Sequence, residues 1–234
     1  MLTCEKLLLQ QDDFALRADL ALAKGRMTAL IGPSGAGKST LLAAIAGFFP
    51  PAKGRIMWNG RDLTDLPPGD RPSSILFQDN NLFPHLSVAQ NVGLALRPRL
   101  RLSAQDAARV NAALVDVGLA GLGGRKPGAL SGGQQSRAAL ARVLLADKPV
   151  VLLDEPFSAL GPGLKMEMLD LVRGKLAGPD RLVIMVTHDP ADARHVADDV
   201  VLVADGRAAA PVETSALFAN PPAVLIDYLG QGPA

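Results

Sequence analysis

The residues from Gly32 to Thr40 have the types and spacing of a loop that binds phosphate groups. They read Gly-Pro-Ser-Gly-Ala-Gly-Lys-Ser-Thr and stand between an apolar run and a helix-like stretch, which is the context that such a loop requires. The glycines let backbone N–H groups converge on an anion at a helix N-terminus, Lys38 can reach β- and γ-phosphate oxygens, and Ser39 can offer its hydroxyl to Mg²⁺. A plain glycine-rich turn would not require the lysine and the serine. The predicted contacts to the phosphates come from Gly32, Pro33, Ser34, Gly35, Ala36, Gly37, Lys38, Ser39 and Thr40.

Two adjacent carboxylates follow an apolar run further along the chain. Val150 to Leu153 has the pattern of a buried strand, and Asp154 and Glu155 come directly after it. In open α/β sheets, ligands bind at this end of the strands. Asp154 is therefore expected to hold the Mg²⁺ shell, and Glu155 to orient or deprotonate the attacking water from outside that shell. Glu155 could instead be an ordinary acidic residue at a strand end, but the phosphate loop upstream argues against it.

A second glycine-rich segment, Leu130 to Gln134, narrows the class of NTPase. The phosphate loop and the two carboxylates alone would also fit kinases and GTPases. At the start of a helix, Ser131 and Gly133 offer a hydroxyl and bare backbone N–H groups, which make a second anion site. One nucleotide rarely needs two such sites from one subunit. We therefore expect two copies to pack head to tail, so that each segment closes over the γ-phosphate held by the other copy and ATP becomes part of the interface. The predicted contacts from this segment are Ser131, Gly132, Gly133 and Gln134.

Composition and charge argue against several classes of protein. The chain has 24 Lys and Arg against 23 Asp and Glu, a net charge of +1, so we expect no nucleic-acid partner. The single Cys4 allows no internal disulfide and fits a reducing compartment. No apolar run approaches the roughly 18 residues of a membrane span, and residues 1–13 are unlike a secretory leader, so a cytoplasmic protein is expected. Hydrophobic residues make up 48% of the chain, which suggests an apolar surface for a partner, although parallel sheet alone could explain it.

Apolar patterning predicts an α/β fold. Four short continuous apolar runs are typical of strands buried on both faces of a parallel sheet, and helix-like patterns lie between them. Leu16 to Leu22 and Arg55 to Trp58 read as strands of a half-buried antiparallel layer, and the second ends at an Asn59-Gly60 turn. We expect a P-loop NTPase core, a mainly parallel sheet flanked by helices, with an antiparallel β subdomain. The continuous runs are Met27 to Ile31, Val150 to Leu153, Leu182 to Val186 and Val200 to Val203, and the helical patterns are Lys38 to Gly47, Leu164 to Leu176 and Ala191 to Ala197.

A helical subdomain is expected inside this core. Between about Asn80 and Asp147 the strand patterns disappear, and a helix-like stretch begins with a capping-box-like Ser103 and Asp106. Residues 1–79 and 148–234 are predicted to form the ATP-binding core with its antiparallel layer, and residues 80–147 the helical subdomain that carries the signature segment. After Gly206 the chain is punctuated by prolines and is too short for another domain.

These landmarks follow one another in the same order as in the nucleotide-binding subunits of ABC transporters, which nearly the whole chain resembles. The resemblance implies that Gln78 contacts Mg²⁺ or the attacking water, and also the membrane subunit. It implies that His188 is the switch histidine, which contacts the γ-phosphate of the nucleotide bound to its own chain. The predicted catalytic residues are Glu155, His188, Gln78 and Lys38, and the predicted Mg²⁺ ligands are Ser39, Gln78 and Asp154.

The same resemblance implies what the chain works with. Its ligands would be ATP and Mg²⁺. Its partners would be a second copy of itself, polytopic membrane permease subunits and, indirectly, a periplasmic solute-binding protein. It would lie on the cytoplasmic face of the inner cell membrane as a peripheral subunit. ATP would close the dimer, hydrolysis by water at Glu155 and phosphate release would reopen it, and the Gln78 region would pass on the motion.

The sequence departs from the family pattern in three places. After Ser158-Ala159-Leu160 the family normally has Asp, and Gly161 here removes a carboxylate expected to couple the two sites, so hydrolysis should survive with weaker coupling. Gln135-Ser136 follows the signature in place of the more usual Arg-Gln. The adenine-stacking aromatic would fall near Gln11, which has no π face, so Phe14 either takes that role or is a core residue.

The cargo can be judged only by resemblance, because importers of this family bind solutes on other subunits. The stretch Pro67 to Leu96 resembles the same segment in the ATP-binding subunits of thiamine importers, which points to uptake of thiamine or its phosphates. Parts of it are also close to importers of iron, sulfate, polyamines or molybdate. A soluble ABC ATPase and a small-molecule kinase are two competing classes of protein. The first usually has paired cassettes or a coiled-coil insertion, and the second has no use for the signature or for His188.

Overall fold

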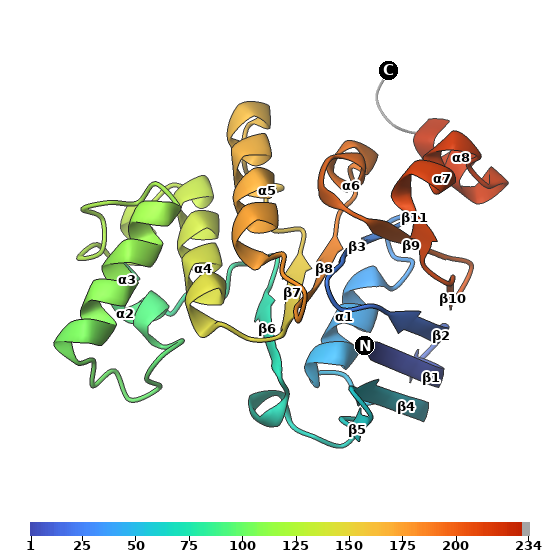
Figure 1. Cartoon of the computed structure of the whole chain (residues 1–234), viewed down its shortest axis with the longest axis horizontal. Coiled ribbons are helices and arrows are strands. Elements are labelled where there is room, and N and C mark those ends of the chain that lie inside the picture. The colour runs from blue at the N-terminus through green and yellow to red at the C-terminus, as the bar shows by residue number, and fades with distance from the viewer. Residues whose placement is uncertain (231–234) are drawn as a thin grey trace.

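The computed structural model describes residues 1–230, so the last four residues of the predicted core range lie outside it. Its strands form one 11-stranded sheet with the order β5-β4-β1-β2-β10-β9-β3-β8-β7-β6, and β11 pairs with β9. Figure 1 shows this sheet curling around α1. The strands are β1 (Leu2–Gln11), β2 (Phe14–Leu22), β3 (Met27–Ile31), β4 (Lys53–Trp58), β5 (Arg61–Asp62), β6 (Ser73–Leu76), β7 (Val150–Asp154), β8 (Leu182–Val186), β9 (Asp199–Ala204), β10 (Arg207–Ala208) and β11 (Val212–Glu213).

Helices cover the sheet and extend from one end of it. Besides the α-helices there are two short 3₁₀ turns, η1 (Pro68–Asp70) and η2 (Pro127–Ala129). Among residues 1–230, no helix is long and apolar enough to span a membrane. The α-helices are α1 (Lys38–Ala46), α2 (Val88–Gly93), α3 (Ala104–Asp116), α4 (Gly132–Ala146), α5 (Pro162–Leu176), α6 (Pro190–Val196), α7 (Thr214–Ala219) and α8 (Ala223–Gly230).

Five strands form the parallel part of the sheet, in the order β6-β7-β8-β3-β9. Every residue of β3, β7 and β8 is buried, which explains why these strands are continuous apolar runs in the sequence. One face of these strands packs on α1, which fills the space between the parallel strands and the antiparallel layer, and the other face packs on α4 and α5. The predicted parallel core is confirmed.

The antiparallel layer consists of β1, β2, β4 and β5. In β2, buried and exposed residues alternate from Leu16 to Leu22, as predicted. Strand β1 has no such regular pattern, because a bulge at Lys6 interrupts its register with both neighbouring strands. The bulge shifts the inward-facing positions from Leu2 and Cys4 to Leu7 and Leu9. One extra residue therefore hides this strand from a period-two reading.

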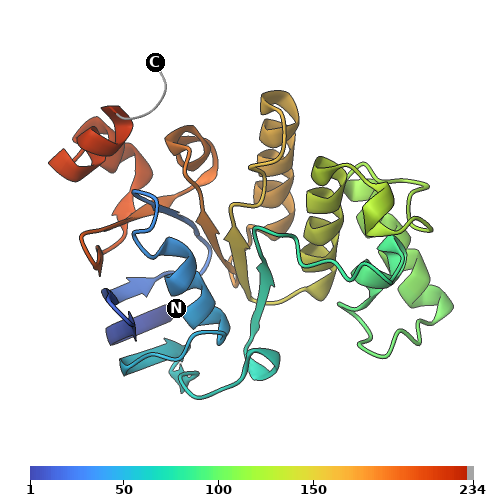
Figure 2. The ribbon, with the colours of Figure 1, turned by 180° about the vertical axis from the view of Figure 1, so that it is seen from behind.

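Three helices, α2, α3 and α4, lie together at one end of the molecule, where α4 joins them to the sheet, as seen from both sides in Figures 1 and 2. They lie in sequence between β6 and β7, and they share a core of buried residues such as Val92, Val110 and Leu140. The predicted cap of α3 is present, because Ser103 accepts from the backbone N–H of Asp106 at 3.1 Å. This grouping agrees with the proposed helical subdomain, whose boundaries at residues 80 and 147 stay a prediction.

The segment after Gly206 contributes more to the structure than its proline punctuation indicates. It adds β10 and β11 to the sheet, and α7 and α8 then follow. Leu217 and Leu225 are buried against Ala29 and Ile31 of the central strand β3. The tail is therefore an integral layer of the core, which brings its last helix close to the ends of the parallel strands.

Candidate functional site

A cleft of about 1130 Å³ opens where the parallel strands end at their carboxyl side. The phosphate loop follows β3, Gln78 follows β6, Glu155 follows β7 and His188 follows β8. All four contribute to the wall of this cleft, as expected for parallel strands whose carboxyl ends meet at one edge. Of the nine predicted loop residues, Ala36 is the exception, because it packs on the core instead. The loop residues that line the cleft are Gly32, Pro33, Ser34, Gly35, Gly37, Lys38, Ser39 and Thr40.

The phosphate loop has a backbone path that requires glycine at two positions. Gly32 has φ +144° and a Cβ there would lie 2.0 Å from the carbonyl oxygen of Val203, while Gly37 has φ +98° and a Cβ there would lie 2.6 Å from the Phe14 ring. Lys38 lies inside the curve of the loop and donates to the carbonyls of Gly32 and Pro33 at 2.7 and 2.8 Å. Burial lowers the pKa of Lys38. The ammonium group is thus held where an anion in the loop would meet it.

Ser39 lines the cleft, and Asp154 is buried next to it, outside the cleft wall. The Ser39 hydroxyl donates to Asp154 Oδ1 at 2.8 Å. Burial raises the pKa of Asp154, although the hydrogen bond from Ser39 and the nearby Lys38 act against the rise. A partly desolvated carboxylate beside a hydroxyl, with the amide of Gln78 in the same cleft, is the kind of oxygen donor set that Mg²⁺ prefers. These residues therefore fit the predicted metal.

Glu155 and His188 form a pair at the mouth of the cleft. His188 Nδ1 lies 3.2 Å from Glu155 Oε2. Glu155 has φ +45°, a left-handed conformation that is uncommon for a residue with a side chain and that occurs often at functional sites. Its N–H donates to the carbonyl of Val186 on β8 at 3.1 Å. The backbone is therefore held in this conformation by the neighbouring strand.

Two residues that the sequence analysis did not single out hold the His188 loop in position. Lys165 on α5 makes ion pairs with Asp189 and Asp192 at 2.7 and 2.6 Å, and the phenol of Tyr228 on α8 donates to the carbonyl of His188. Burial raises the pKa of Tyr228, and the charges of Asp189 and Glu155 add to the rise. Lys165 is 24 residues from Asp189 in the chain, and Tyr228 is 40 residues from His188. No local sequence pattern could therefore have revealed either contact.

The signature segment is not part of this cleft. Ser131 is the N-cap of α4, where its hydroxyl accepts from Gln134 N at 3.3 Å and its own N–H donates to Gln134 Oε1 at 3.0 Å. A Cβ on Gly133 would lie 2.7 Å from Leu160 Cδ2, so this glycine also allows the segment after Glu155 to pack on α4. Within one chain, Ser131, Gly132, Gly133 and Gln134 stay outside the wall of the phosphate-loop cleft.

Hydrogen bonds join the segment after Gln78 to α4, the helix that begins at the signature. Arg142 on α4 donates to the carbonyls of Asn81 and Asn80 at 2.9 and 3.1 Å, directly after Gln78. Burial lowers the pKa of Arg142, while the charge of Asp79 favours its ionised form. The segment that carries Gln78 is thus tied to the helix that begins at the signature.

The structure also locates the three departures from the family pattern. Phe14 lines the cleft next to Gly37, whereas Gln11 is exposed and outside the cleft wall. Gly161 is the N-cap of α5, which has no side-chain cap as a result. Gln135 donates from its side chain to the carbonyls of Pro127 and Leu130 at 3.2 and 3.3 Å. Gln135 therefore acts locally in the approach to the signature helix.

A sheet that presents a phosphate loop and strand-end carboxylates to one cleft defines a phosphate-loop NTPase. The family model described as ABC transporter matches residues 16–158, which is more than half of the chain, and the chain belongs to the ABC transporter family. This membership and the predicted fold class are both confirmed. The site residues stay predictions, because they rest on geometry and motif alone.

Comparisons with individual proteins agree with this membership. A protein from Cereibacter sphaeroides named Thiamine import ATP-binding protein ThiQ is 61% identical over 98% of this chain and 100% of its own length. Proteins of the same name from Ruegeria sp. and Escherichia coli are 52% and 50% identical, over 98% and 83% of this chain and 100% and 84% of their own. Among solved structures, the dimeric post-hydrolysis state of the ATP-binding cassette MJ0796 bound to ADP and Pi has a TM-score of 0.81 at 28% identity, and covers 92% of this chain and 99% of its own.

Proposed function

We propose that this chain is the ATP-binding and ATP-hydrolysing subunit of an ABC importer for thiamine. The observation that carries the proposal is the convergence of Lys38, Ser39, Glu155 and His188 in one cleft, with Asp154 hydrogen-bonded to Ser39 behind the cleft wall. The cargo is supported by relatives named Thiamine import ATP-binding protein ThiQ, which are up to 61% identical over nearly the whole chain. The chemistry of the chain itself concerns ATP, and other subunits bind the solute.

Hydrolysis uses the groups at the mouth of the cleft. Lys38 and the loop N–H groups bind the phosphates of ATP and offset the charge that develops on them. A water oxygen forms a bond to the γ-phosphorus while the bond from that phosphorus to the bridging oxygen of ADP breaks. Glu155 orients this water or accepts its proton. His188, 3.2 Å from Glu155, would donate to the γ-phosphate.

Mg²⁺ would be held by Ser39, Asp154 and Gln78. When bound, it would neutralise charge on the β- and γ-phosphate oxygens. The support for this assignment is the hydroxyl and carboxylate oxygens 2.8 Å apart and the raised pKa of the Asp154 carboxyl. A cation beside this carboxylate would offset the cost of its burial.

The working unit is a head-to-tail dimer. Ser131, Gly132, Gly133 and Gln134 lie outside their own chain's cleft, which leaves them available to close over ATP held by a second copy. The exposed α4 N-terminus supplies N–H groups to that ATP. The related cassette MJ0796 is dimeric in its solved structure, which supports the same arrangement here.

The membrane partner contacts the surface beside Gln78. Phe48 is 55% exposed, and its ring packs edge-on against Phe77 with the centroids 5.3 Å apart. Phe83 is 44% exposed in the same segment that follows Gln78. Exposed aromatic side chains of this kind are typical of protein interfaces. We assign this surface to polytopic permease subunits, which would hold the chain at the cytoplasmic face of the membrane and connect it indirectly to a periplasmic solute-binding protein.

Phe14 is the residue that stacks on adenine. It lines the cleft, while Gln11 does not. Stacking of a base on an aromatic ring contributes about 1–3 kcal/mol, so Phe14→Ala should weaken ATP binding by about 5- to 150-fold and leave the chain folded. Fluorescent ATP-analogue titration measures this, with Gln11→Ala as the control. Unchanged affinity in Phe14→Ala would assign Phe14 to the core alone.

The cargo is tested by uptake into proteoliposomes that contain the complete transporter, loaded with ATP and Mg²⁺ and supplied with its solute-binding protein. Radiolabelled thiamine should accumulate, and Lys38→Ala in this chain should abolish the accumulation. Ferric iron, sulfate, putrescine and molybdate serve as comparison solutes. ATP-dependent uptake of one of these in place of thiamine would refute the cargo while leaving the ATPase assignment intact.

A further inference from the structure

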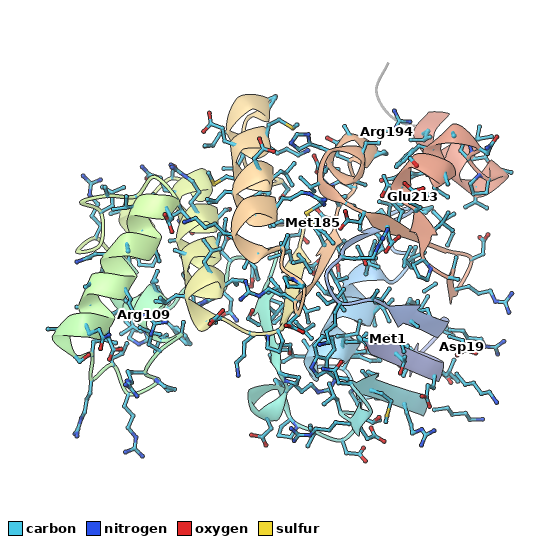
Figure 3. All side chains as sticks on the ribbon, in the orientation of Figure 1. Met1, Asp19, Arg109, Met185, Arg194 and Glu213 are labelled. Atoms are coloured by element: carbon cyan, nitrogen blue, oxygen red, sulfur yellow. The ribbon has the colours of Figure 1, made fainter. Side chains whose placement is uncertain are left out.

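A second cleft, of about 590 Å³, opens on the antiparallel layer away from the nucleotide site. Its rim carries four basic side chains, all exposed, and one acidic side chain, Asp19. Figure 3 shows Asp19 on the side of this layer that faces away from α1. Between the charged groups lie the apolar side chains of Leu8 and Ala209. The four basic residues are Lys6, Arg17, Lys53 and Arg207, and we refer to them as the basic row.

The sheet register brings the basic row together from four strands. Arg207 on β10 lies opposite Arg17 on β2, Arg17 lies opposite Leu8 on β1, and Leu8 lies opposite Lys53 on β4. Because neighbouring strands are about 4.8 Å apart, three cationic residues fall on one line across the sheet, roughly 14 Å long. Like charges directly opposite each other, as in the Arg207–Arg17 pair, destabilise a sheet.

Within residues 1–230, the positive charge of the basic row is only partly offset by an acidic side chain. Among residues 1–230, none of the four basic side chains makes an ion pair, although the neighbouring Arg55 does pair with Glu5 at 2.8 Å. Asp19 accepts a hydrogen bond from the backbone N–H of Lys6 at 3.2 Å. One carboxylate faces four cations, so the cleft keeps an excess of positive charge.

The bulge in β1 gives the cleft its fourth cation. Lys6 has φ +48°, and at this residue the register of β1 shifts relative to both neighbouring strands, β2 and β4. The partner strand is adapted to the bulge, because Gly54 has φ +88° and a Cβ there would lie 2.5 Å from the carbonyl oxygens of both Glu5 and Lys6. Bulges of this kind re-aim side chains and are typical of functional sites. Here the bulge brings Lys6 to the rim of the cleft.

We propose that this cleft binds a small organic phosphate, an anion with two or more negative charges and an apolar part. Arg17 and Arg207 can each grip phosphate oxygens with two N–H groups, and the two lysines add charge. Leu8 and Ala209 offer a surface for the apolar part. The volume of the cleft lies within the range of small-molecule sites. A bound phosphate would relieve the repulsion between the opposed arginines. The site is separate from the ATP cleft, because the two clefts share no lining residue.

The test uses pyrophosphate as the probe and the full chain saturated with MgADP, so that the phosphate loop is occupied. Isothermal titration calorimetry measures affinity, and ¹⁵N NMR of the backbone amides of Lys6 and Arg17 locates the binding. The double variant Arg17→Gln/Arg207→Gln should bind at least about tenfold more weakly, since two charged hydrogen-bonding groups are lost. The control Arg61→Gln/Arg101→Gln removes the same charge from exposed positions outside the cleft, and it should bind within about twofold of the original chain.

Several outcomes separate this site from a general charge effect. The ATPase activity of Arg17→Gln/Arg207→Gln should equal that of the original chain. Its thermal unfolding midpoint should equal or exceed that of the original chain. If that variant is poorly folded, Lys6→Gln/Lys53→Gln provides the same test. Equal losses in the test and control variants would overturn the proposal. Absence of amide shifts at Lys6 and Arg17, or binding to phosphatidylglycerol vesicles without binding to pyrophosphate, would also overturn it.

Discussion

The two glycine-rich segments of this chain both precede a helix, but they are used differently. The phosphate loop ends at Gly37, an N-cap in the left-handed conformation without a side-chain hydrogen bond to α1. The signature ends in a capping box, in which Ser131 and Gln134 satisfy each other's N–H groups at the start of α4. The first helix end therefore keeps its N–H groups free for an anion, whereas the second is partly satisfied by its own side chains.

The phosphate loop and the signature also differ in the residues that surround them. The phosphate loop lies in a cleft with Gln78, Glu155 and His188, so one chain supplies most of the groups that are predicted to handle phosphate. The signature is outside that cleft. The comparison supports the proposal that one half-site is complete within a chain, while the other becomes functional only against a second copy. This is why the isolated chain should be a poor ATPase.

The largest effect should come from the complete half-site. Glu155→Gln should lower the rate of ATP hydrolysis by about 10²- to 10⁴-fold, because the group that orients or deprotonates water is lost. ATP binding should survive, and ATP should trap a dimer that size-exclusion chromatography with light scattering detects. Glu167→Gln, an exposed change on α5, is the matched control. Rapid turnover by Glu155→Gln would refute the assignment.

The next effect concerns the support of His188. Lys165→Met leaves Asp189 and Asp192 without their ion pairs and should reduce the free energy of unfolding by about 1–2 kcal/mol. We expect the lower end of this range, because Asp189 is 40% exposed and solvent screens its charge. kcat should fall several-fold with KM for ATP nearly unchanged, because His188 loses its position while the phosphate loop is intact. Lys165→Arg should restore both quantities. A fall in stability without any change in kcat would limit Lys165 to a structural role.

The same ion pairs predict a pH dependence. Burial acts against the charge of Lys165, but its hydrogen bonds to Asp189 and Asp192 prevail and raise its pKa. Its stabilisation is complete below the unfolded-state pKa near 10 and is lost as the pH rises through the raised value. Burial likewise opposes the charge of Asp189, and Lys165 lowers its pKa, so its contribution is lost as the pH falls below about 4. Urea unfolding should show the largest difference between the original chain and Lys165→Met between these two limits.

The incomplete half-site can be tested with two caps of the same design. Ser131→Ala at the signature and Ser103→Ala at α3 each remove one capping box, and each should cost about 1 kcal/mol of stability. Only Ser131→Ala should also lower ATPase activity, because its hydroxyl has a second use at the ATP of the other copy. Equal activity in the two variants would mean that the signature serine is a helix cap and nothing more.

The smallest effect on stability is expected at the connection between the half-sites. Gly161→Asp gives α5 an N-cap side chain, which should raise stability by a few tenths of a kcal/mol, roughly the difference between Gly and Asp caps. It also supplies the carboxylate expected to couple the two sites, so the cooperativity of ATPase activity in ATP should increase markedly. Gly163→Asp adds a carboxylate two residues away, in open space, and should leave cooperativity unchanged. No change in Gly161→Asp would refute the coupling role of this position.

The sequence by itself determined the features that depend on neighbours along the chain. Continuous apolar runs revealed the parallel strands such as β7, and the spacing from Gly32 to Thr40 revealed the phosphate loop, because burial on both faces and anion binding each impose a short local pattern. The cap at Ser103 was readable for the same reason. The sequence did not predict strand β1, because one extra residue at Lys6 disrupts its alternation of buried and exposed residues. It also did not predict α7 and α8, which have no comparable local pattern.

Only the tertiary structure decided which distant residues act together. The contacts of Lys165 and Tyr228 with the His188 loop depend on how α5 and α8 pack against the ends of the strands. The basic row depends on the register of four strands, which places Arg207 opposite Arg17 although 190 residues separate them in the chain. Packing and register are set by the whole core, so no local pattern encodes them. The motifs predicted which groups handle phosphate, and the fold revealed which groups hold them in place.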